Sequence, residues 1–540
     1  MTTVPTRPTR PTRRTMPATL AQLSGRPVVV GSGLAGLLTA LDLAPYSPVL
    51  ITATELGTDC ASDWAQGGLA AAVGTDDDVR LHAQDTLAAG AGLCDEYVVR
   101  AVTAQAPAAV QRLIDLGAQL DRRSDGTLAL GREGAHHRDR IVHAAGDGTG
   151  HELTRAALAA VHREADRGRI TLLAHHRAVR LLTGPEGAIA GLVLHTPEGS
   201  GRLLTPHVVL ATGGAGSLYR YTTNPRGARG GGLALGLRAG AAVRDLEFVQ
   251  FHPTALDVDL DPMPLVSEAV RGHGARLIDE RGGFVADDDL AARDVVARQV
   301  WAAIERGCRV HLDTPSLGPD MATLFPTVTA AARDAGIDPL RQPLPVRPAA
   351  HYHMGGLLVD RRGRTTVPGL WAVGEVASTG LHGGNRLASN SLVEAAVCSR
   401  WVATDVAAEV AAAGAVAPGG PTDRSDRADR ADRADDDAAV QTALTPDPRA
   451  RFILTEAAGV LRDHRGLTVA VHELREGALA NDARLVSLVL AWSALHRTES
   501  RGGHTRTDHP DRRPARHTVT TLSGVLQALH ESHDIRERSA

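Results

Sequence analysis

The sequence contains no lysine, so all 58 of its basic residues are arginine. This absence, together with the abundance of alanine and glycine, is typical of the coding bias of a GC-rich genome. Acidic and basic residues nearly cancel, and the formal net charge is −4. A balance of this kind lacks the basic excess of nucleic-acid-binding proteins, so we expect no nucleic acid as a partner.

Cysteine and long apolar runs are also scarce. The four cysteines lie far apart and have no CxxC spacing, so we expect neither a disulfide framework nor a metal site. They are Cys60, Cys94, Cys308 and Cys398. No stretch approaches the ~18 apolar residues of a membrane-spanning helix. The pair Arg13-Arg14 could suggest a twin-arginine signal, but no apolar run of useful length follows it. We therefore expect a disordered tail over residues 1–24, a cytoplasmic protein and no membrane contact.

A chain of 540 residues is too long for one hydrophobic core, so two or three domains are expected. An apolar strand at 27–30 runs into a glycine turn, and a helix and a second strand at 49–51 follow it. This order within about 30 residues predicts a βαβ unit. Two later strands, at 208–211 and 370–373, also end in glycine turns, where open α/β sheets bind ligands. The pattern favours a nucleotide-binding domain that is interrupted by an insertion.

The C-terminal part of the sequence changes in character twice. From Ala411 to Arg449 it is rich in Ala, Gly and Pro and repeats Asp-Arg-Ala between Asp423 and Asp437. Such a segment cannot bury a core and is interpreted as a linker. Apolar residues then recur at helical spacing from Arg451 to about Leu495, which predicts a small helical domain.

The first glycine turn is Gly31-x-Gly33-x-x-Gly36. Because it lies between a strand and a helix, it predicts a dinucleotide site rather than a bare structural turn. Gly31 permits the tight turn, Gly33 lets the backbone approach the pyrophosphate, and Gly36 lets helix and strand pack closely.

Several further segments resemble those of the succinate dehydrogenase/fumarate reductase flavoprotein superfamily. They are Ala65-Gln66-Gly67-Gly68, Ala211-Thr212-Gly213-Gly214, and Gly374-Glu375 with Ser389-Asn390-Ser391-Leu392. The resemblance runs from about Val28 to Arg400, with a weaker C-terminal match at 499–504. It implies an α/β fold: a Rossmann-like FAD-binding domain (residues 25–239 and 350–412) interrupted by an α+β capping domain (240–349). A linker (413–447) and a C-terminal helical bundle domain (448–540) would follow.

The resemblance also implies the cofactor, which is FAD. Members with covalent FAD carry a His five residues before the Gln of the Ala-Gln-Gly-Gly motif, and here that position is Ala61, so non-covalent binding is expected. Glu375 would hold the ribose, and Ser391 and Leu392 would contact the flavin through their backbones. The remaining expected cofactor residues are Gly31, Ser32, Gly33, Leu34, Ala35, Gly36, Thr54, Ala65, Gln66, Gly67, Gly68 and Asn390.

Two positions depart from the family pattern. Aspartate-oxidising relatives commonly have Ser-Lys after the second strand, where this chain has Ala53-Thr54. They also usually have an Asp at the position of Gly231. Since both are cofactor contacts in the family, the departures predict weaker retention of FAD.

A C4 dicarboxylate carries two negative charges, so a closed site for it needs fixed cationic donors at both ends. By resemblance the substrate ligands are His252, His351, Arg386 and Ser267, and Ser389 is a further expected contact. Taken singly, each histidine or arginine could equally be a surface residue in a chain with 24 histidines.

The proton-transfer residue of the family is the first Arg of Arg-Asp-x-Val-Ala-Arg, here Arg293 at an expected helix start. Because a free guanidinium scarcely deprotonates, an electrostatic clamp is the alternative role. The nearby Glu268 could simply pair with Arg271 at (i, i+3) on a helix.

Aspartate differs from succinate by an ammonium group, which a purely cationic site would reject. Residues 131–138 resemble the Arg-Glu-Gly-Gly-His stretch of aspartate-oxidising members, whose Glu sits near the substrate amine. Glu133 is therefore the residue expected to select aspartate. The alternative is a surface glutamate paired with Arg132 or Arg138.

The resemblance thus implies FAD-dependent oxidation of L-aspartate to iminoaspartate, with O2 or fumarate as electron acceptor. This is the first step of quinolinate and NAD biosynthesis, and a transient contact with quinolinate synthase would follow from it. The alternatives are a soluble fumarate reductase or succinate oxidase, a flavoprotein subunit that docks an iron–sulfur partner, and an inactive flavin-binding protein.

Overall fold

The structure, a computed structural model, describes residues 19–414 and 443–538. Its centre is a five-stranded parallel sheet in the order β17-β10-β1-β2-β6. These short strands are rich in Val, Leu and Ile and are covered on both faces, as expected of a parallel sheet: β1 (Val28–Val30), β2 (Val49–Ile51), β6 (Thr171–Leu173), β10 (Val208–Leu210) and β17 (Leu370–Ala372).

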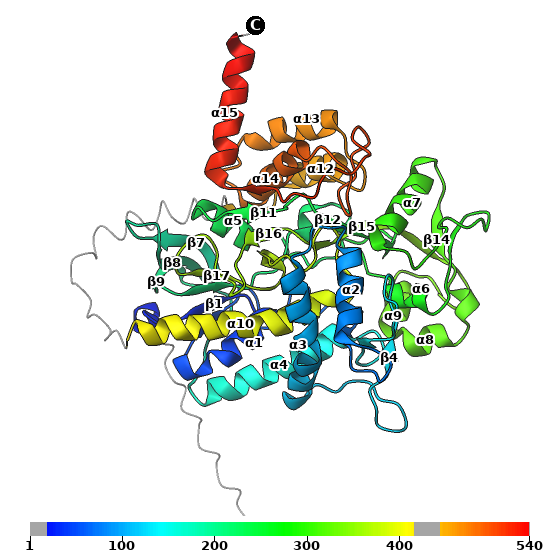
Figure 1. Cartoon of the computed structure of the whole chain (residues 1–540), viewed down its shortest axis with the longest axis horizontal. Coiled ribbons are helices and arrows are strands. Elements are labelled where there is room, and N and C mark those ends of the chain that lie inside the picture. Colours follow the sequence, from blue (N-terminus) through cyan, green and yellow to red (C-terminus); the bar gives the residue numbers. More distant parts are fainter. Residues whose placement is uncertain (1–18, 415–442, 539–540) are drawn as a thin grey trace, which may run out of the picture.

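Alternate side chains of the central strands enter two different cores. Val29 packs into the core formed with the helices on one face, whereas Val28 and Val30 enter the core on the other face. Figure 1 shows that the helices on the Val29 face lie together. They are α1 (Leu34–Asp42), α3 (Glu96–Asp115), α4 (Thr149–Asp166) and α10 (Asn390–Ala412), with α2 (Val79–Ala89) against α3.

Three small sheets complete this body. One is an antiparallel meander, β7 (Arg177–Thr183), β8 (Ile189–Thr196) and β9 (Gly199–Leu204). A second is β3 (Leu69–Ala70), β5 (Ile141–Val142) and β4 (Leu130–Gly131). The third contains β18 (Ala377–Ser378), β16 (Gly356–Leu358), β11 (Val243–Arg244) and β19 (Val519–Thr520), beside α5 (Gly231–Arg238).

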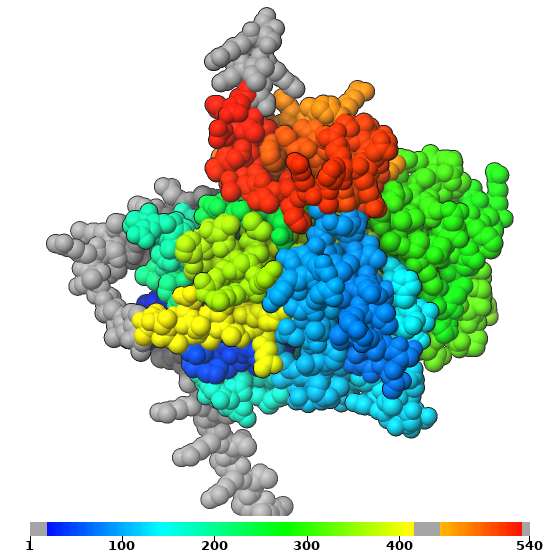
Figure 2. Space-filling model, viewed as in Figure 1, coloured from blue at the N-terminus to red at the C-terminus, as the bar shows by residue number. Residues whose placement is uncertain are grey.

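The inserted region builds its own sheet and core, and we call it the cap. Its strands are β12 (Val249–Leu256), β13 (Leu277–Asp279), β14 (Val310–Leu312) and β15 (Leu344–His353). Its helices are α6 (Glu268–Gly272), α7 (Arg293–Glu305), α8 (Asp320–Leu324) and α9 (Pro326–Asp334). Figures 1 and 2 show the cap, in green, beside the body.

The C-terminal region is helical, with α12 (Pro448–Ala457), α13 (His464–Arg475), α14 (Asp482–His496) and α15 (Leu522–Arg538). It packs on the body, in orange and red in Figure 2, and shares a core with the central sheet. Five 3-10 turns are described: η1 (Leu20–Leu23), η2 (Ala44–Tyr46), η3 (Gly216–Leu218), η4 (Pro315–Leu317) and η5 (Gly374–Val376).

These features confirm the predicted fold class. The tail predicted over residues 1–24 needs a correction, because η1 is ordered and Leu23 is only 2% exposed. Residues 1–18 and 415–442, which hold the rest of the tail and most of the predicted linker, lie outside the described residues. The domain boundaries remain predictions. Among the helices described here, none is long and apolar enough to cross a membrane.

Candidate active site

A cavity of about 820 Å³ runs from the glycine turns of the central sheet to the underside of the cap. It brings together residues predicted for the cofactor and residues predicted for the substrate. Of the expected cofactor residues it is lined by Gly31, Ser32, Gly33, Ala35, Thr54, Ala65, Gln66, Gly67, Gly68, Glu375, Ser391 and Leu392. Of the expected substrate and catalytic residues it is lined by Glu133, His252, Ser267, Arg293, His351, Arg386 and Ser389.

Three expected cofactor residues do not line the cavity. Leu34 and Gly36 face the protein from the first turn of α1, whereas Asn390 turns its side chain toward α2. There Asn390 Nδ2 donates to Thr86 Oγ1 at 3.0 Å and its Oδ1 lies 2.8 Å from His82 Nε2. The part of these three residues in binding the cofactor stays a prediction.

The glycine turn is as tight as its sequence requires. Gly31 has φ +114°, and a Cβ there would lie 2.2 Å from the carbonyl oxygen of Ala211. A Cβ on Gly36 would lie 1.9 Å from the carbonyl oxygen of Gly31, so only glycine lets α1 begin directly on the end of β1.

The residues present fit a dinucleotide such as FAD. Among the helices that begin at this cavity in the described part of the chain, α1, α5 and α10 have no N-cap side chain that accepts from their first N–H groups. The N–H of Leu34 in α1 donates to Ser62 Oγ at 3.2 Å. The positive ends of these helix dipoles suit phosphate and flavin oxygens. Two buried polar atoms of the lining, Gln66 Oε1 and Thr212 Oγ1, have no hydrogen-bond partner within residues 19–414 and 443–538.

The positions that depart from the family pattern also border this cavity. A Cβ on Gly231 would meet nothing within 4 Å, so this side of the cavity is open. Thr54 lines the cavity too, but its hydroxyl lies 3.3 and 3.4 Å from carbonyl oxygens of its own loop, those of Glu55 and Thr58.

Glu375 lies at the end of β17, where its Oε1 accepts a hydrogen bond of 2.9 Å from the backbone N–H of His353. Burial raises the pKa of Glu375 to about 7, although that hydrogen bond and the nearby Arg386 act in the opposite direction. A Cβ on Gly214 would lie 2.3 Å from the same carboxylate, so glycine at that position makes room for Glu375. His353 itself points away from the cavity, with its Nε2 2.9 Å from the carbonyl oxygen of Leu246.

Two histidines form one wall of the substrate end, and their ring centroids are 5.0 Å apart. The backbone N–H of Thr254 donates to His252 Nδ1 at 3.3 Å, so a neutral ring carries its proton on Nε2. That buried Nε2 has no partner among the described residues. Burial and the nearby Arg293 hold the pKa of His252 well below its usual value, so the ring offers a neutral N–H donor. His351 Nδ1 lies 2.9 Å from Thr223 Oγ1.

Two guanidinium groups meet at Gln250, a residue that was not among the predicted site residues although it lies two positions before His252. Gln250 Oε1 accepts from Arg293 Nη1 at 3.1 Å and from Arg386 Nε and Nη2 at 3.3 Å each. Its amide nitrogen donates to Asn385 Oδ1 and to the carbonyl oxygen of Arg386. Burial, with repulsion from Arg293, lowers the pKa of Arg386 to about 10. The pair is therefore a concentrated positive charge at one end of the cavity.

Arg293 is the first residue of α7, as predicted, and its Nε donates to Glu268 Oε2 at 2.7 Å. Glu268 also has the predicted (i, i+3) pair with Arg271, at 3.1 Å. Burial alone would raise the pKa of Glu268, but Arg293 and Arg271 together bring it below its usual value. Ser267 caps α6 by accepting from the N–H of Ala269.

Glu133 is buried, with 2% of its surface exposed, and faces the cavity. Ser389, which has φ +61°, donates from its Oγ to Glu133 Oε2 at 2.6 Å. Neither alternative partner holds it: Arg132 pairs with Asp139 at 2.7 Å, and Arg138 donates to backbone carbonyls. Burial raises the pKa of Glu133, partly offset by Arg293. A buried carboxylate without a hydrogen-bonded cation in the described structure is suited to an ammonium group.

Comparison with known proteins adds to this geometry. The FAD binding domain family model matches residues 26–392, and the fumarate reductase flavoprotein C-terminal model matches residues 478–536. An L-aspartate oxidase of Mesorhizobium japonicum is 49% identical over 94% of this chain and 97% of its own length. One of Streptomyces coelicolor is 44% identical over 92% of this chain and 91% of its own.

Solved structures with the same fold include an Escherichia coli quinol fumarate reductase. Its TM-score is 0.82 and its identity 28%, covering 92% of this chain and 94% of that chain. A Mycobacterium smegmatis Sdh1 complex in the apo form has a TM-score of 0.76 and 28% identity, covering 91% and 90%.

Proposed function

This chain belongs to the FAD-binding flavoproteins and, within them, to the L-aspartate oxidases, and we propose that the cavity beneath the cap is where L-aspartate is oxidised. The reaction is the FAD-dependent conversion of L-aspartate to iminoaspartate in NAD biosynthesis. Bound FAD supplies the hydride acceptor for this chemistry. The protein's own residues have to bind the substrate, orient it and exclude water from it.

In this proposal the two ends of the substrate meet different residues. Arg386 binds one carboxylate, and the Nε2–H of His252 with His351 and Ser267 binds the other. Ser389, which lines the cavity beside Glu133, lies within the same site. Both positively charged groups around Gln250 are fixed before substrate arrives, so their orientation costs little on binding. The same cationic end suits fumarate, and we propose O2 or fumarate as the electron acceptor.

Arg293 is proposed to relay the proton that leaves the substrate: its guanidinium gives its Nε proton to Glu268 Oε2 and takes up the substrate proton in exchange, so its charge is unchanged at the end. Its contact with Glu268 at 2.7 Å, and that of Glu268 with Arg271 at 3.1 Å, provides a chain of groups through which a proton can move. The alternative, a purely electrostatic role, would need only the positive charge.

The observation that carries the choice of L-aspartate is the isolated, buried carboxylate of Glu133. A site made only of cations would repel the substrate ammonium, and Glu133 is held at the cavity by Ser389 rather than neutralised by an arginine. Succinate and fumarate have no ammonium group that could pair with this carboxylate.

The test is Glu133→Gln, which keeps the size and removes the charge. We expect kcat/KM for L-aspartate to fall at least 30-fold, roughly the 2 kcal/mol of a buried charge pair, while fumarate reduction with a reduced dye changes less than threefold. Equal losses in both reactions would show that Glu133 does not bind the amine. A wild-type protein that exchanges electrons with fumarate or succinate but not with L-aspartate would instead favour a soluble fumarate reductase.

Two further points belong to this proposal. A transient contact with quinolinate synthase would pass on the unstable iminoaspartate, and co-purification or channelling assays would detect it. A cytoplasmic location is supported by the four cysteines, which stand as free thiols.

A further inference from the structure

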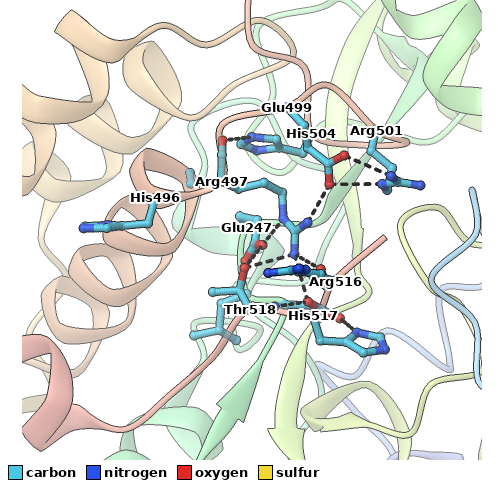
Figure 3. Close-up of polar contacts among 12 residues, drawn as sticks. Glu247, His496, Arg497, Glu499, Arg501, His504, Arg516, His517 and Thr518 are labelled. Atoms are coloured by element: carbon cyan, nitrogen blue, oxygen red, sulfur yellow. Dashed lines mark hydrogen bonds and ion pairs between the residues drawn. The ribbon is translucent and has the colours of Figure 1, made fainter. Parts of the chain in front are cut away.

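Outside the cavity, a group of buried charges lies where the C-terminal region meets the body, and Figure 3 shows it. Arg497 follows α14 and is 7% exposed. It donates to Glu247, to Glu499 Oε1 at 2.7 Å and to Asp245 Oδ1 at 3.3 Å. Asp245 and Glu247 immediately precede β12, the strand that carries Gln250 and His252. The C-terminal region is therefore attached at the start of a substrate-site strand.

The turn at residues 500–506, which we call the C-terminal turn, contacts three elements that carry substrate-site residues. The N–H of Gly503 donates to the carbonyl oxygen of Gly384 at 2.9 Å, two residues before Arg386. A Cβ on Gly503 would lie 2.6 Å from the carbonyl oxygen of Val249, the residue before Gln250. From the cap, Arg298 of α7 reaches Thr505 Oγ1 at 3.5 Å, one helical turn after Arg293.

Gly502 allows the C-terminal turn to approach the loop of Gly384 closely. It has φ +51°, and a Cβ there would lie 2.2 Å from the carbonyl oxygen of Gly384. Only glycine allows this conformation and this approach without strain. The backbone of the C-terminal turn thus lies directly against the loop that holds Arg386.

Arg462, which lies between α12 and α13, holds the C-terminal turn in place. Its Nη1 donates to the carbonyl oxygen of Glu247 at 2.7 Å and to His504 Nδ1 at 2.8 Å, and its Nη2 to the carbonyl oxygen of Gly503 at 3.3 Å. His504 is fully buried, and its Nε2 donates to the carbonyl oxygen of Arg497 at 3.1 Å. One guanidinium therefore connects the start of β12 with the back of the Gly384 loop.

We propose that Arg462 and the C-terminal turn are positioning elements of the dicarboxylate site: by fixing the Gly384 loop against β12, they set the distance between Arg386 and the His252 wall. This inference rests on the proposed role of Arg386 as a carboxylate ligand. Arg462 itself touches no substrate, and its effect is exerted through the backbone on either side of it.

The test compares two arginines of the C-terminal region. Arg462→Met removes the link to the Gly384 loop. The matched control is Arg484→Met, because Arg484 bonds Asp447 and the carbonyl oxygens of Glu473 and Glu476, all within the C-terminal region. Both variants are expected to lower Tm. The deciding measurement is fumarate binding to the oxidised, FAD-loaded enzyme, followed through the flavin absorbance, together with KM and kcat for L-aspartate.

We expect Arg462→Met to raise the Kd for fumarate and the KM for L-aspartate about tenfold or more, since a displacement of ~1 Å in a positioned group has large effects. FAD affinity and, for Arg484→Met, both substrate constants should stay within twofold of wild type. Wild-type constants in Arg462→Met, or equal increases in both variants, would overturn the proposal. Failure of the proposed function would look different: wild-type enzyme would then turn over no L-aspartate, whether or not fumarate still changed the flavin absorbance.

Discussion

The substrate end of the cavity and the Arg497 network contain the same kinds of charged side chain. They differ in whether those side chains have partners within the protein. Around Arg497 the donors and carboxylates bond to one another, inside the protein. In the cavity, Arg386 hydrogen-bonds only to neutral groups of the described residues, Gln250 and Ser391, and the His252 Nε2 proton has no acceptor there, although Arg293 is paired with Glu268. A buried charge stabilises the fold where its partner of opposite charge is part of the protein. Where the protein supplies no such partner, the charge is available to bind a ligand.

The largest expected effect comes from removing a cavity cation. Arg386→Met should lower kcat/KM for L-aspartate and for fumarate about 10³-fold, roughly 4 kcal/mol, because a dicarboxylate loses its desolvated partner. The Tm of the apoprotein should stay the same or rise, because burial and Arg293 already disfavour the charged form, as its pKa of about 10 shows. Thermal unfolding beside steady-state kinetics measures both. A fall in Tm would show that the cavity cations are also structural, and the contrast would be lost.

The second-largest effect is expected on the stability of the fold and not on substrate binding. Arg497→Met should lower the free energy of unfolding by about 3 kcal/mol, because it leaves Glu247 buried without its cation, whereas Glu499 keeps its pair with Arg501. Denaturant unfolding of the apoprotein measures it. The control is Arg132→Met, whose pair with Asp139 is about half exposed (52% and 50%) and should change stability by less than ~0.5 kcal/mol. Equal effects of the two substitutions would mean that burial of the network adds nothing to stability.

The smallest effect concerns Glu375, which lies near the charged groups Arg386 and Glu394. With a pKa of about 7, it is a carboxylate above that pH, and in its predicted role it accepts hydrogen bonds from the FAD ribose. Below it, the group is protonated and accepts them less well. The Kd for FAD should therefore rise between pH 8 and pH 6, by at most about tenfold for a single proton. Glu375→Gln should abolish this dependence, and a slope retained in that variant would assign it to another group.

The sequence predicts the nucleotide-binding part well because its constraints are local. Gly36 is required by its approach to the carbonyl oxygen of Gly31, five residues away, and the apolar runs predicted as strands at 27–30, 49–51, 208–211 and 370–373 form strands at 28–30, 49–51, 208–210 and 370–372. Arg293 at a helix start and the Glu268–Arg271 pair were predicted for the same reason.

What the sequence could not predict depends on contacts between distant segments. Gln250 has its role only because two guanidinium groups, 43 and 136 residues away, converge on it. The release of Glu133 from Arg132 follows from the competing Asp139, and both are in one loop whose shape no pattern of residues specifies. The seating of residues 500–506 behind Arg386 likewise needs the tertiary structure, although the glycines of that turn were a visible signal.

Because the chain is synthesised from its N-terminus, β11 is made long before β19, the strand that pairs with it. Residues that line the cavity all precede residue 415, whereas the C-terminal turn and the strand that completes the sheet of β11 come more than 80 residues later. A nascent or prematurely ended chain thus possesses the groups that hold the flavin before it possesses the framework behind Arg386. A chain that stops before residue 500 lacks the backbone support of Arg386, the arginine proposed to bind the substrate.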